Sequence, residues 1–228
     1  MFALKPNKKI GLLFLLVVFS TNIVGQNDEK KAIELYEKGI QLGKDGNYEE
    51  ALKILKQSQK LNPKQFGINN GLGVAYMFLG KFGEAVDNLH KAIQLYPNDD
   101  LVRVNFCLAL DLNKELEKAI FQCQEAVKIN PESSVAYYLL ANKLQKANRL
   151  DEAIETIEEA LLKFPQEEKL LFSLGSFYSA RSNFIDALKI LEKLVQAKPK
   201  VSAYRVALSE AYLRFERVDE AAATALEA

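Results

Sequence analysis

The chain has 228 residues, and its 30 lysines and arginines balance its 30 aspartates and glutamates. A balanced charge without a basic run argues against nucleic-acid binding, which needs a basic surface to displace counterions from phosphate. The composition, 49% hydrophobic and 26% charged, is typical of a soluble folded protein and excludes a disordered chain.

The first 25 residues differ in composition from the rest. Lys5, Lys8 and Lys9 precede an apolar run of ten residues, 10–19, which is shorter than the ~20 residues that a membrane-spanning helix needs. This order is typical of a secretory signal peptide. We therefore expect residues 1–25 to be a cleaved signal or, alternatively, an uncleaved N-terminal membrane anchor, and residues 26–31 to be a short linker. The remaining chain would carry a net charge of −3, because the acidic residues all follow these three lysines.

The rest of the chain, residues 32–228, is built on a period of 34 residues. Five of the six prolines follow this period: Pro63, Pro97, Pro131, Pro165 and Pro199. With each of them numbered position 32, repeats start at 32, 66, 100, 134, 168 and 202, and the last is incomplete. Position 20 is alanine in all six repeats, as Ala51, Ala85, Ala119, Ala153, Ala187 and Ala221. Position 8 is small in each: Gly39, Gly73, Cys107, Ala141, Gly175 and Ser209.

Each repeat predicts two antiparallel amphipathic helices. Apolar residues recur at helical spacing on both sides of position 15, where three repeats have residues that tolerate a left-handed turn: Gly46, Gly80 and Asn148. An acidic residue opens the second helix at position 19 in five of the six repeats, where it meets the positive end of the helix dipole. The proline at position 32 should end the second helix and can itself start the next one.

The segments Leu72-Gly73-Val74-Ala75-Tyr76 and Leu174-Gly175-Ser176-Phe177-Tyr178 complete this pattern. With the alanines and prolines, they resemble the tetratricopeptide repeat family, although the chain has no tryptophan. The resemblance implies an all-α fold, a right-handed superhelical solenoid of about six helix-turn-helix repeats. Solenoids normally end in a polar capping helix, and the sixth repeat lacks one. We therefore expect either a longer natural chain or self-association through this end.

No pattern of catalytic or metal-binding residues is apparent, so we expect no enzyme activity and no cofactor. His90 is the only histidine and is expected on the solvated convex face, which excludes histidine-based triads and zinc sites. Carboxylate pairs such as Glu158-Glu159 are expected to be solvated surface. Cys107 and Cys123 fall at core positions of the third repeat. A disulfide stays open but is the less favoured alternative, because paired helices usually run too far apart for one.

The resemblance also implies a binding surface, since positions 2, 5, 9, 12 and 13 of the first helices line the concave groove that holds peptides in the family. Carried onto this chain, these positions give a groove of Tyr36, Ile40, Val74, Met77, Phe78, Leu101, Val104, Leu108, Asp111, Leu112, Tyr138, Asn142, Gln145 and Phe172, with Val135, Lys146, Lys169, Ser176 and Ser179 at equivalent places. Part of this set is expected to pack between adjacent helices instead.

These observations predict an exported, non-enzymatic scaffold that binds a peptide or partner protein in the concave groove, in the periplasm or outside the cell. An alternative is that the repeats are the N-terminal docking module of a longer enzyme or of a secretion or envelope assembly protein. Neither alternative involves nucleic acid, and contact with a membrane would come only through an uncleaved N-terminal segment.

Overall fold

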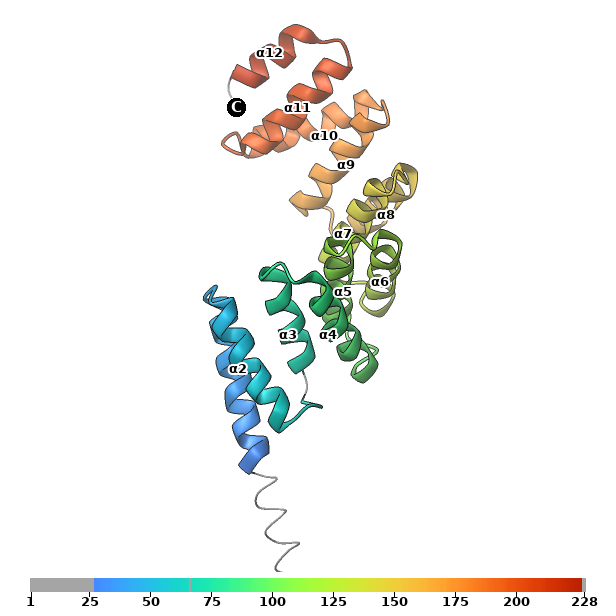
Figure 1. Cartoon of the computed structure of the whole chain (residues 1–228). Helices are drawn as coiled ribbons and strands as arrows, with labels where there is room; N and C mark the ends of the chain where they lie inside the picture. The colour runs from blue at the N-terminus through green and yellow to red at the C-terminus, as the bar shows by residue number, and fades with distance from the viewer. Residues whose placement is uncertain (1–26, 66, 227–228) are drawn as a thin grey trace, which may run out of the picture. The chain divides into compact units, whose positions relative to one another are not determined.

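The computed structural model describes residues 27–65 and 67–226, so the expected signal or anchor, residues 1–25, lies outside the described residues. Every regular element within these two ranges is an α-helix (Figure 1). The chain divides into two compact units, which we call the N-terminal unit, ending at Pro97, and the C-terminal unit, beginning at Asn98. The all-α solenoid class predicted from the repeat is confirmed.

The N-terminal unit contains a helical segment over residues 27–44 and three further helices, α2 (Tyr48–Leu61), α3 (Ile68–Phe78) and α4 (Phe82–Leu95). Residues 27–31, expected to be part of a linker, are already helical. Two acidic residues, Asp28 and Glu29, stand in this first turn and favour a helix N-terminus. The segment is held to α2 by the hydroxyl of Ser58, which donates to the carbonyl of Ala32 at 2.7 Å.

The C-terminal unit contains eight helices in its described residues, arranged as four hairpins in chain order (Figure 1). Their bounds are α5 (Asp100–Leu112), α6 (Leu116–Ile129), α7 (Ser134–Lys146), α8 (Leu150–Lys163), α9 (Glu168–Ala180), α10 (Phe184–Ala197), α11 (Ser202–Arg214) and α12 (Val218–Leu226). Each helix packs on its sequence neighbours, and α5, α7, α9 and α11 also contact one another in that order. Within this unit, neighbours in sequence are therefore neighbours in space.

The turn inside each hairpin is the same in all six repeats. The residue at position 15 has a positive φ in each, between 60° and 81°, and these residues are Gly46, Gly80, Lys114, Asn148, Ser182 and Glu216. The amide that follows donates to a carbonyl five residues earlier, as from Lys81 to Tyr76 at 2.9 Å, which closes the Schellman type of helix end. Gly46, Gly80 and Asn148 adopt this conformation readily, whereas Lys114, Ser182 and Glu216 disfavour it, so in these three repeats the fold imposes the turn.

Each proline ends a helix as predicted but does not start the next one. The residues before the five prolines are C-caps with φ between −122° and −140°, outside the α region. In the C-terminal unit the following first helices begin three residues after the proline, as α7 begins at Ser134 after Pro131. In the N-terminal unit, α3 begins later still, because Gly67 takes a left-handed φ of 78° just before Ile68.

The tight contact within each hairpin joins position 8 to position 24. A Cβ added to Gly73 would lie 2.5 Å from Cγ of Leu89, and one added to Gly39 would lie 2.7 Å from Cγ of Leu55. The predicted alanines at position 20 are all buried, with at most 1% exposure. In the repeats that have glycine at position 8, a leucine at position 24 therefore packs directly against it.

In the third repeat the same contact is a disulfide between Cys107 and Cys123. The two Cα atoms are 5.5 Å apart, and both side chains are fully buried. The expectation that the helices run too far apart for a disulfide is therefore wrong. Position 8 is a point of close approach in the first, second and fifth hairpins as well, so the usual separation of helix axes does not apply there.

Candidate functional site

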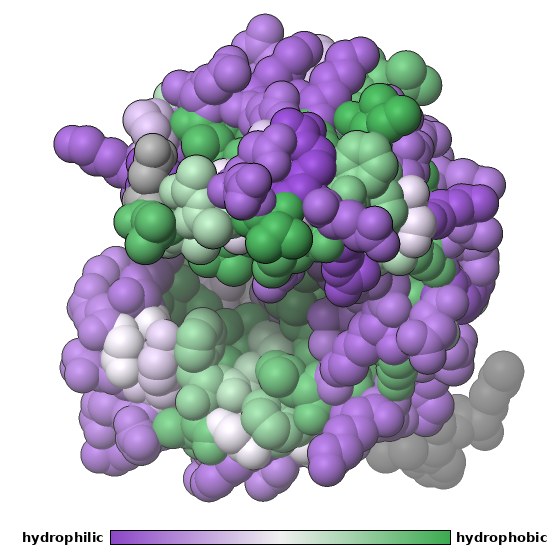
Figure 2. All heavy atoms as spheres, turned by 90° about the horizontal axis from the view of Figure 1, so that it is seen from above, coloured by the Kyte–Doolittle hydropathy of each residue, from purple (hydrophilic) through white to green (hydrophobic). Residues whose placement is uncertain are grey.

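The facing sides of α5 and α7 bring most of the predicted groove positions of the C-terminal unit together. We call this surface the α5–α7 face, and it consists of Leu101, Leu108, Asp111 and Leu112 from α5 with Val135, Tyr138, Asn142, Gln145 and Lys146 from α7. Three of its apolar side chains are largely exposed: Leu101 at 59%, Leu112 at 45% and Val135 at 54%. Figure 2 shows that hydrophobic surface gathers over parts of the molecule instead of being scattered evenly among polar side chains. Gathered apolar surface of this kind marks interaction sites.

An ion-pair group crosses the α5–α7 face. Both carboxylate oxygens of Asp111 are paired, one with Nζ of Lys143 and one with Nζ of Lys146, each at 2.5 Å. Burial by itself would raise the pKa of the Asp111 carboxyl, but the two lysine hydrogen bonds outweigh burial and lower that pKa. With two lysines on one carboxylate, the group has a net charge of +1, which favours an acidic partner.

Lys143 was not among the residues predicted for the groove. It stands at position 10 of its repeat, outside the family's groove positions, and its side chain is only 12% exposed. The signal that could have found it is charge: Asp111 is the only acidic residue among those predicted for the groove, and two lysines stand in the last turn of the next first helix.

Two predicted groove residues of the N-terminal unit pack between helices instead. The hydroxyl of Tyr36 lies where a Cβ of Gly67 would be. Burial raises the pKa of the Tyr36 hydroxyl. Ile40 lies in the same way over Gly71, 3.0 Å from the position of an added Cβ. Both side chains are therefore half-buried against the start of α3.

The end of α3 carries an aromatic pair. Phe78 is 61% exposed, yet its ring stacks on that of Tyr48 with centroids 4.3 Å apart. Val74 and Met77, also predicted for the groove, are partly exposed on the same helix. Tyr48 was not predicted, because it is the first residue of a second helix and stands outside the family's groove positions.

Other predicted groove residues belong to the core of the C-terminal unit. Val104 is 7% exposed and packs in a cluster with Ala126 and Ala136. Phe172 lies against Tyr204 of α11, with ring centroids 5.2 Å apart. The predicted set therefore contains both packing residues and accessible ones, and the α5–α7 face holds most of the accessible ones in this unit.

The residues considered for catalysis and metal binding lie as follows. Within the described residues, no three His, Cys, Asp or Glu side chains are placed to hold a metal ion, and His90 is exposed. Glu158 accepts a hydrogen bond from the hydroxyl of Tyr178, and Glu159 accepts one from that of Tyr137 at 2.8 Å. The hydrogen bond raises the pKa of Tyr178 to about 12, and burial followed by the hydrogen bond raises that of Tyr137 to about 12. The carboxylate pair, expected to be simply solvated, thus holds two helices in place.

A search of the described helices for membrane spans found none with the length and apolar character to cross a bilayer.

Helix hairpins of constant length, stacked in chain order and sharing one tight contact, define a helical-repeat protein of the solenoid class. Two family models of the tetratricopeptide repeat match the chain, one over residues 42–103 and 112–174 and the other over residues 178–228. The chain belongs to the tetratricopeptide repeat family.

Curated relatives match through part of their length. The BBSome complex member BBS4 of Bos taurus is 29% identical over 143 residues, which are 63% of this chain and 27% of the relative. Sperm-associated antigen 1 of Mus musculus is 32% identical over 115 residues, 48% of this chain and 12% of the relative. The chain spans about a quarter or less of the length of these relatives.

Solved structures share the fold at low identity. A structure described as PilF of Pseudomonas aeruginosa has a TM-score of 0.74 at 18% identity, covering 88% of this chain and 91% of that one. A tetratricopeptide repeat protein from Parabacteroides merdae has a TM-score of 0.76 at 19% identity, covering 86% and 77%. YrrB, described as having an unusual peptide-binding site, has a TM-score of 0.64 at 21% identity, covering 81% and 94%. These likenesses show the fold alone.

Proposed function

We propose that the protein is a non-enzymatic interaction scaffold whose α5–α7 face binds a segment of a partner protein. The observation that carries the proposal is the exposure of Leu101, Leu112 and Val135 on one surface beside the net positive group at Asp111. Apolar side chains of a partner would be buried on the leucines and the valine, and an acidic residue would face the lysines. Peptide binding by YrrB, a structural neighbour, is consistent with this use of the fold.

We further propose that the protein works outside the cytoplasm, in the periplasm or as a secreted protein. The basic and apolar N-terminal residues support export. The Cys107–Cys123 disulfide supports it independently, because disulfides persist in oxidising compartments and are rare in the cytosol.

Partner capture with matched variants tests the binding face. The double variant Leu101→Glu/Leu112→Glu places two charges on the α5–α7 face and should lose the partner. The control, Leu162→Glu/Ile185→Glu, adds the same charges at apolar residues that are 86% and 73% exposed elsewhere in the C-terminal unit, and should retain it. Equal capture by both variants, with both folded by circular dichroism, would remove the α5–α7 face as the binding site.

A separate experiment tests export. Fusing residues 1–31 to a reporter enzyme that is active only after export should give activity, and replacing Lys8 and Lys9 with glutamate should reduce it. A silent fusion would leave the protein in the cytoplasm and contradict the proposed location, whatever the result of partner capture.

A further inference from the structure

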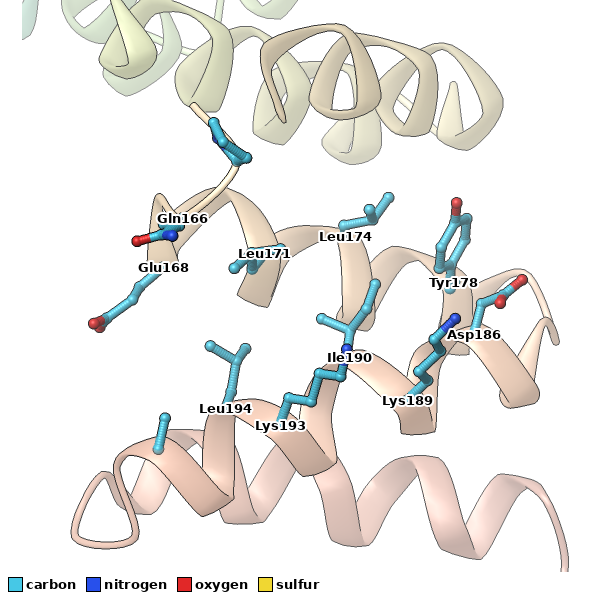
Figure 3. A pocket seen from close by; sticks show the side chains of 12 residues that line it. Gln166, Glu168, Leu171, Leu174, Tyr178, Asp186, Lys189, Ile190, Lys193 and Leu194 are labelled. Atoms are coloured by element: carbon cyan, nitrogen blue, oxygen red, sulfur yellow. The ribbon is translucent and has the colours of Figure 1, made fainter. Parts of the chain in front are cut away.

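A pocket of about 570 Å³ lies between α9 and α10, apart from the α5–α7 face. Four apolar side chains point into it: Leu171 and Leu174 from α9, and Ile190 and Leu194 from α10 (Figure 3). Its volume is in the range of sites that bind ligand groups, roughly 300–1,000 Å³. All of its lining residues belong to the C-terminal unit.

The preceding repeat carries a larger side chain at one corresponding position. Position 4 of the fourth repeat is Tyr137, which is 1% exposed and whose hydroxyl donates to Glu159 at position 26, at 2.8 Å. In the fifth repeat position 4 is Leu171, which is shorter and has no polar tip, and position 26 is Lys193. The fifth repeat therefore lacks a phenol-sized group between its helices, and the charge that faced this group is reversed.

Two lysines give the rim of the pocket positive charge. Lys189 and Lys193 lie one helical turn apart on α10, both exposed, and neither is joined to an acidic residue by an ion pair among the described residues. A carboxylate brought to this rim would meet two ammonium groups beside an apolar floor. Such a pair contributes more when a bound ligand excludes water from it.

The acidic and phenolic groups at the rim already have partners. Glu168 pairs with Lys198 at 2.5 Å, and Asp186 accepts a hydrogen bond from the side-chain amide of Asn183 at 2.9 Å. The hydroxyl of Tyr178 is used by its hydrogen bond to the preceding hairpin. An incoming ligand therefore finds the lysines, and not the acids, ready to bind.

We propose that this pocket binds an aromatic side chain from an acidic segment of a partner protein. The ring takes the place that the Tyr137 ring fills in the fourth repeat, and a neighbouring Asp or Glu of the ligand pairs with Lys193 and Lys189. Because Lys189 and Lys193 are exposed at the rim, an extended chain can pass across the opening while one side chain enters. This second site goes beyond the proposed function, since it shares no residue with the α5–α7 face.

The direct test uses methyl NMR of the full chain with a blocked pentapeptide, Glu-Glu-Phe-Glu-Glu, as the probe. Saturable shifts are expected at the methyl groups of Leu171, Leu174 and Ile190. Replacing the phenylalanine with alanine, or the four glutamates with lysines, should weaken binding at least tenfold. Absence of shifts at these methyl groups, or equal affinity for the three peptides, would overturn the proposal.

Two variants separate the pocket from other causes. Leu171→Tyr copies the fourth repeat, fills the pocket and should weaken probe binding at least tenfold without lowering the melting temperature. Lys193→Glu changes only the exposed rim and should weaken binding several-fold with the fold intact. A folded Leu171→Tyr protein that binds the probe as well as the unmodified chain would refute the site.

The remaining controls assign the occupant. The Leu101→Glu/Leu112→Glu variant should bind the probe normally, because the two sites share no residue. A negative result for the α5–α7 face therefore does not affect the test of the pocket, and a negative result for the pocket does not affect the test of the α5–α7 face. Free 3-phenylpropionate presents the same ring and carboxylate without a peptide chain, and it should bind at least tenfold more weakly than the pentapeptide. Equal or tighter binding of 3-phenylpropionate would make this a small-molecule site and overturn the assignment to a partner segment.

Discussion

Reduction of the Cys107–Cys123 disulfide should destabilise one hairpin strongly and its distant neighbours little. The two cysteines are 16 residues apart and join α5 to α6 at their closest approach. A cross-link that closes a loop of this length stabilises the folded state by about 3 kcal/mol, because it restricts the unfolded chain. A loss of about 3 kcal/mol corresponds to a roughly 100-fold increase in the population of the opened hairpin.

Amide hydrogen exchange measured segment by segment by mass spectrometry suits this prediction. Repeat proteins unfold by local units, so exchange reports the opening of each hairpin separately. The protein should be unfolded, reduced and refolded in the presence of thiol, because both sulfurs are buried in the native state. Exchange in α5 and α6 should accelerate roughly 100-fold for amides that exchange through opening of the hairpin, while α11 should change little. Unchanged exchange in α5 and α6 after verified reduction would refute the loop-entropy argument.

The other repeats supply a matched replacement for the disulfide. In the second repeat, positions 8 and 24 are Gly73 and Leu89, and the leucine fills the space above the glycine. The variant Cys107→Gly/Cys123→Leu should therefore be more stable than Cys107→Ser/Cys123→Ser, which places two hydroxyls in an apolar contact. The opposite order in denaturant unfolding would show that the third hairpin does not share the packing of the second.

Three further predictions concern single residues. Ala119→Leu should cost ~1 to 3 kcal/mol in denaturant unfolding, because the side chain is fully buried at the hairpin contact; an unchanged midpoint would contradict the repeat register. Glu216→Gly should stabilise the last hairpin by about 1 kcal/mol, measured as slower exchange in α12, because Glu216 has a φ of 61°. Asp111→Asn should cost about 1 to 3 kcal/mol at pH 7, by loss of its bonds to Lys143 and Lys146. Because the pKa of Asp111 is lowered in the folded state, its carboxylate stabilises the fold above the ordinary aspartate pKa of about 4, and this stabilisation is lost as the pH falls through the lowered pKa. At low pH, the melting temperature of Asp111→Asn should therefore match that of the unmodified chain.

Much of the fold could be predicted because the residues that end helices and form turns recur at the same positions of each repeat. Prolines end the second helices, and position 15 takes a left-handed turn even where it is Lys114 or Glu216. What periodicity does not give is the distance between two helices at one contact. That distance depends on how small both partners are, so average helix spacing disfavours the Cys107–Cys123 disulfide that the structure shows.

The candidate binding face could be predicted only in part, for a related reason. Groove positions from the family give the direction of a side chain but not the size of its neighbour. Tyr36 and Ile40 lie flat on the next first helix because Gly67 and Gly71 leave space there. Leu101, at another groove position, remains 59% exposed. Accessibility therefore depends on pairs of residues one repeat apart, which a single-position pattern does not contain.

Binding specificity in such a chain arises where the repeats differ from one another. Residues that are alike in every repeat, such as the alanine at Ala119, build the stack and are the same for any partner. A position at which one repeat departs from its neighbours changes the surface at one place only. Compared with the fourth repeat, the fifth has Leu171 where the fourth has Tyr137, and Lys193 where the fourth has Glu159. A cavity lies between the helices of the fifth repeat, and its rim carries a lysine where the fourth repeat has a carboxylate. Because the two changes affect the same space, one ligand with a ring and a carboxylate complements both.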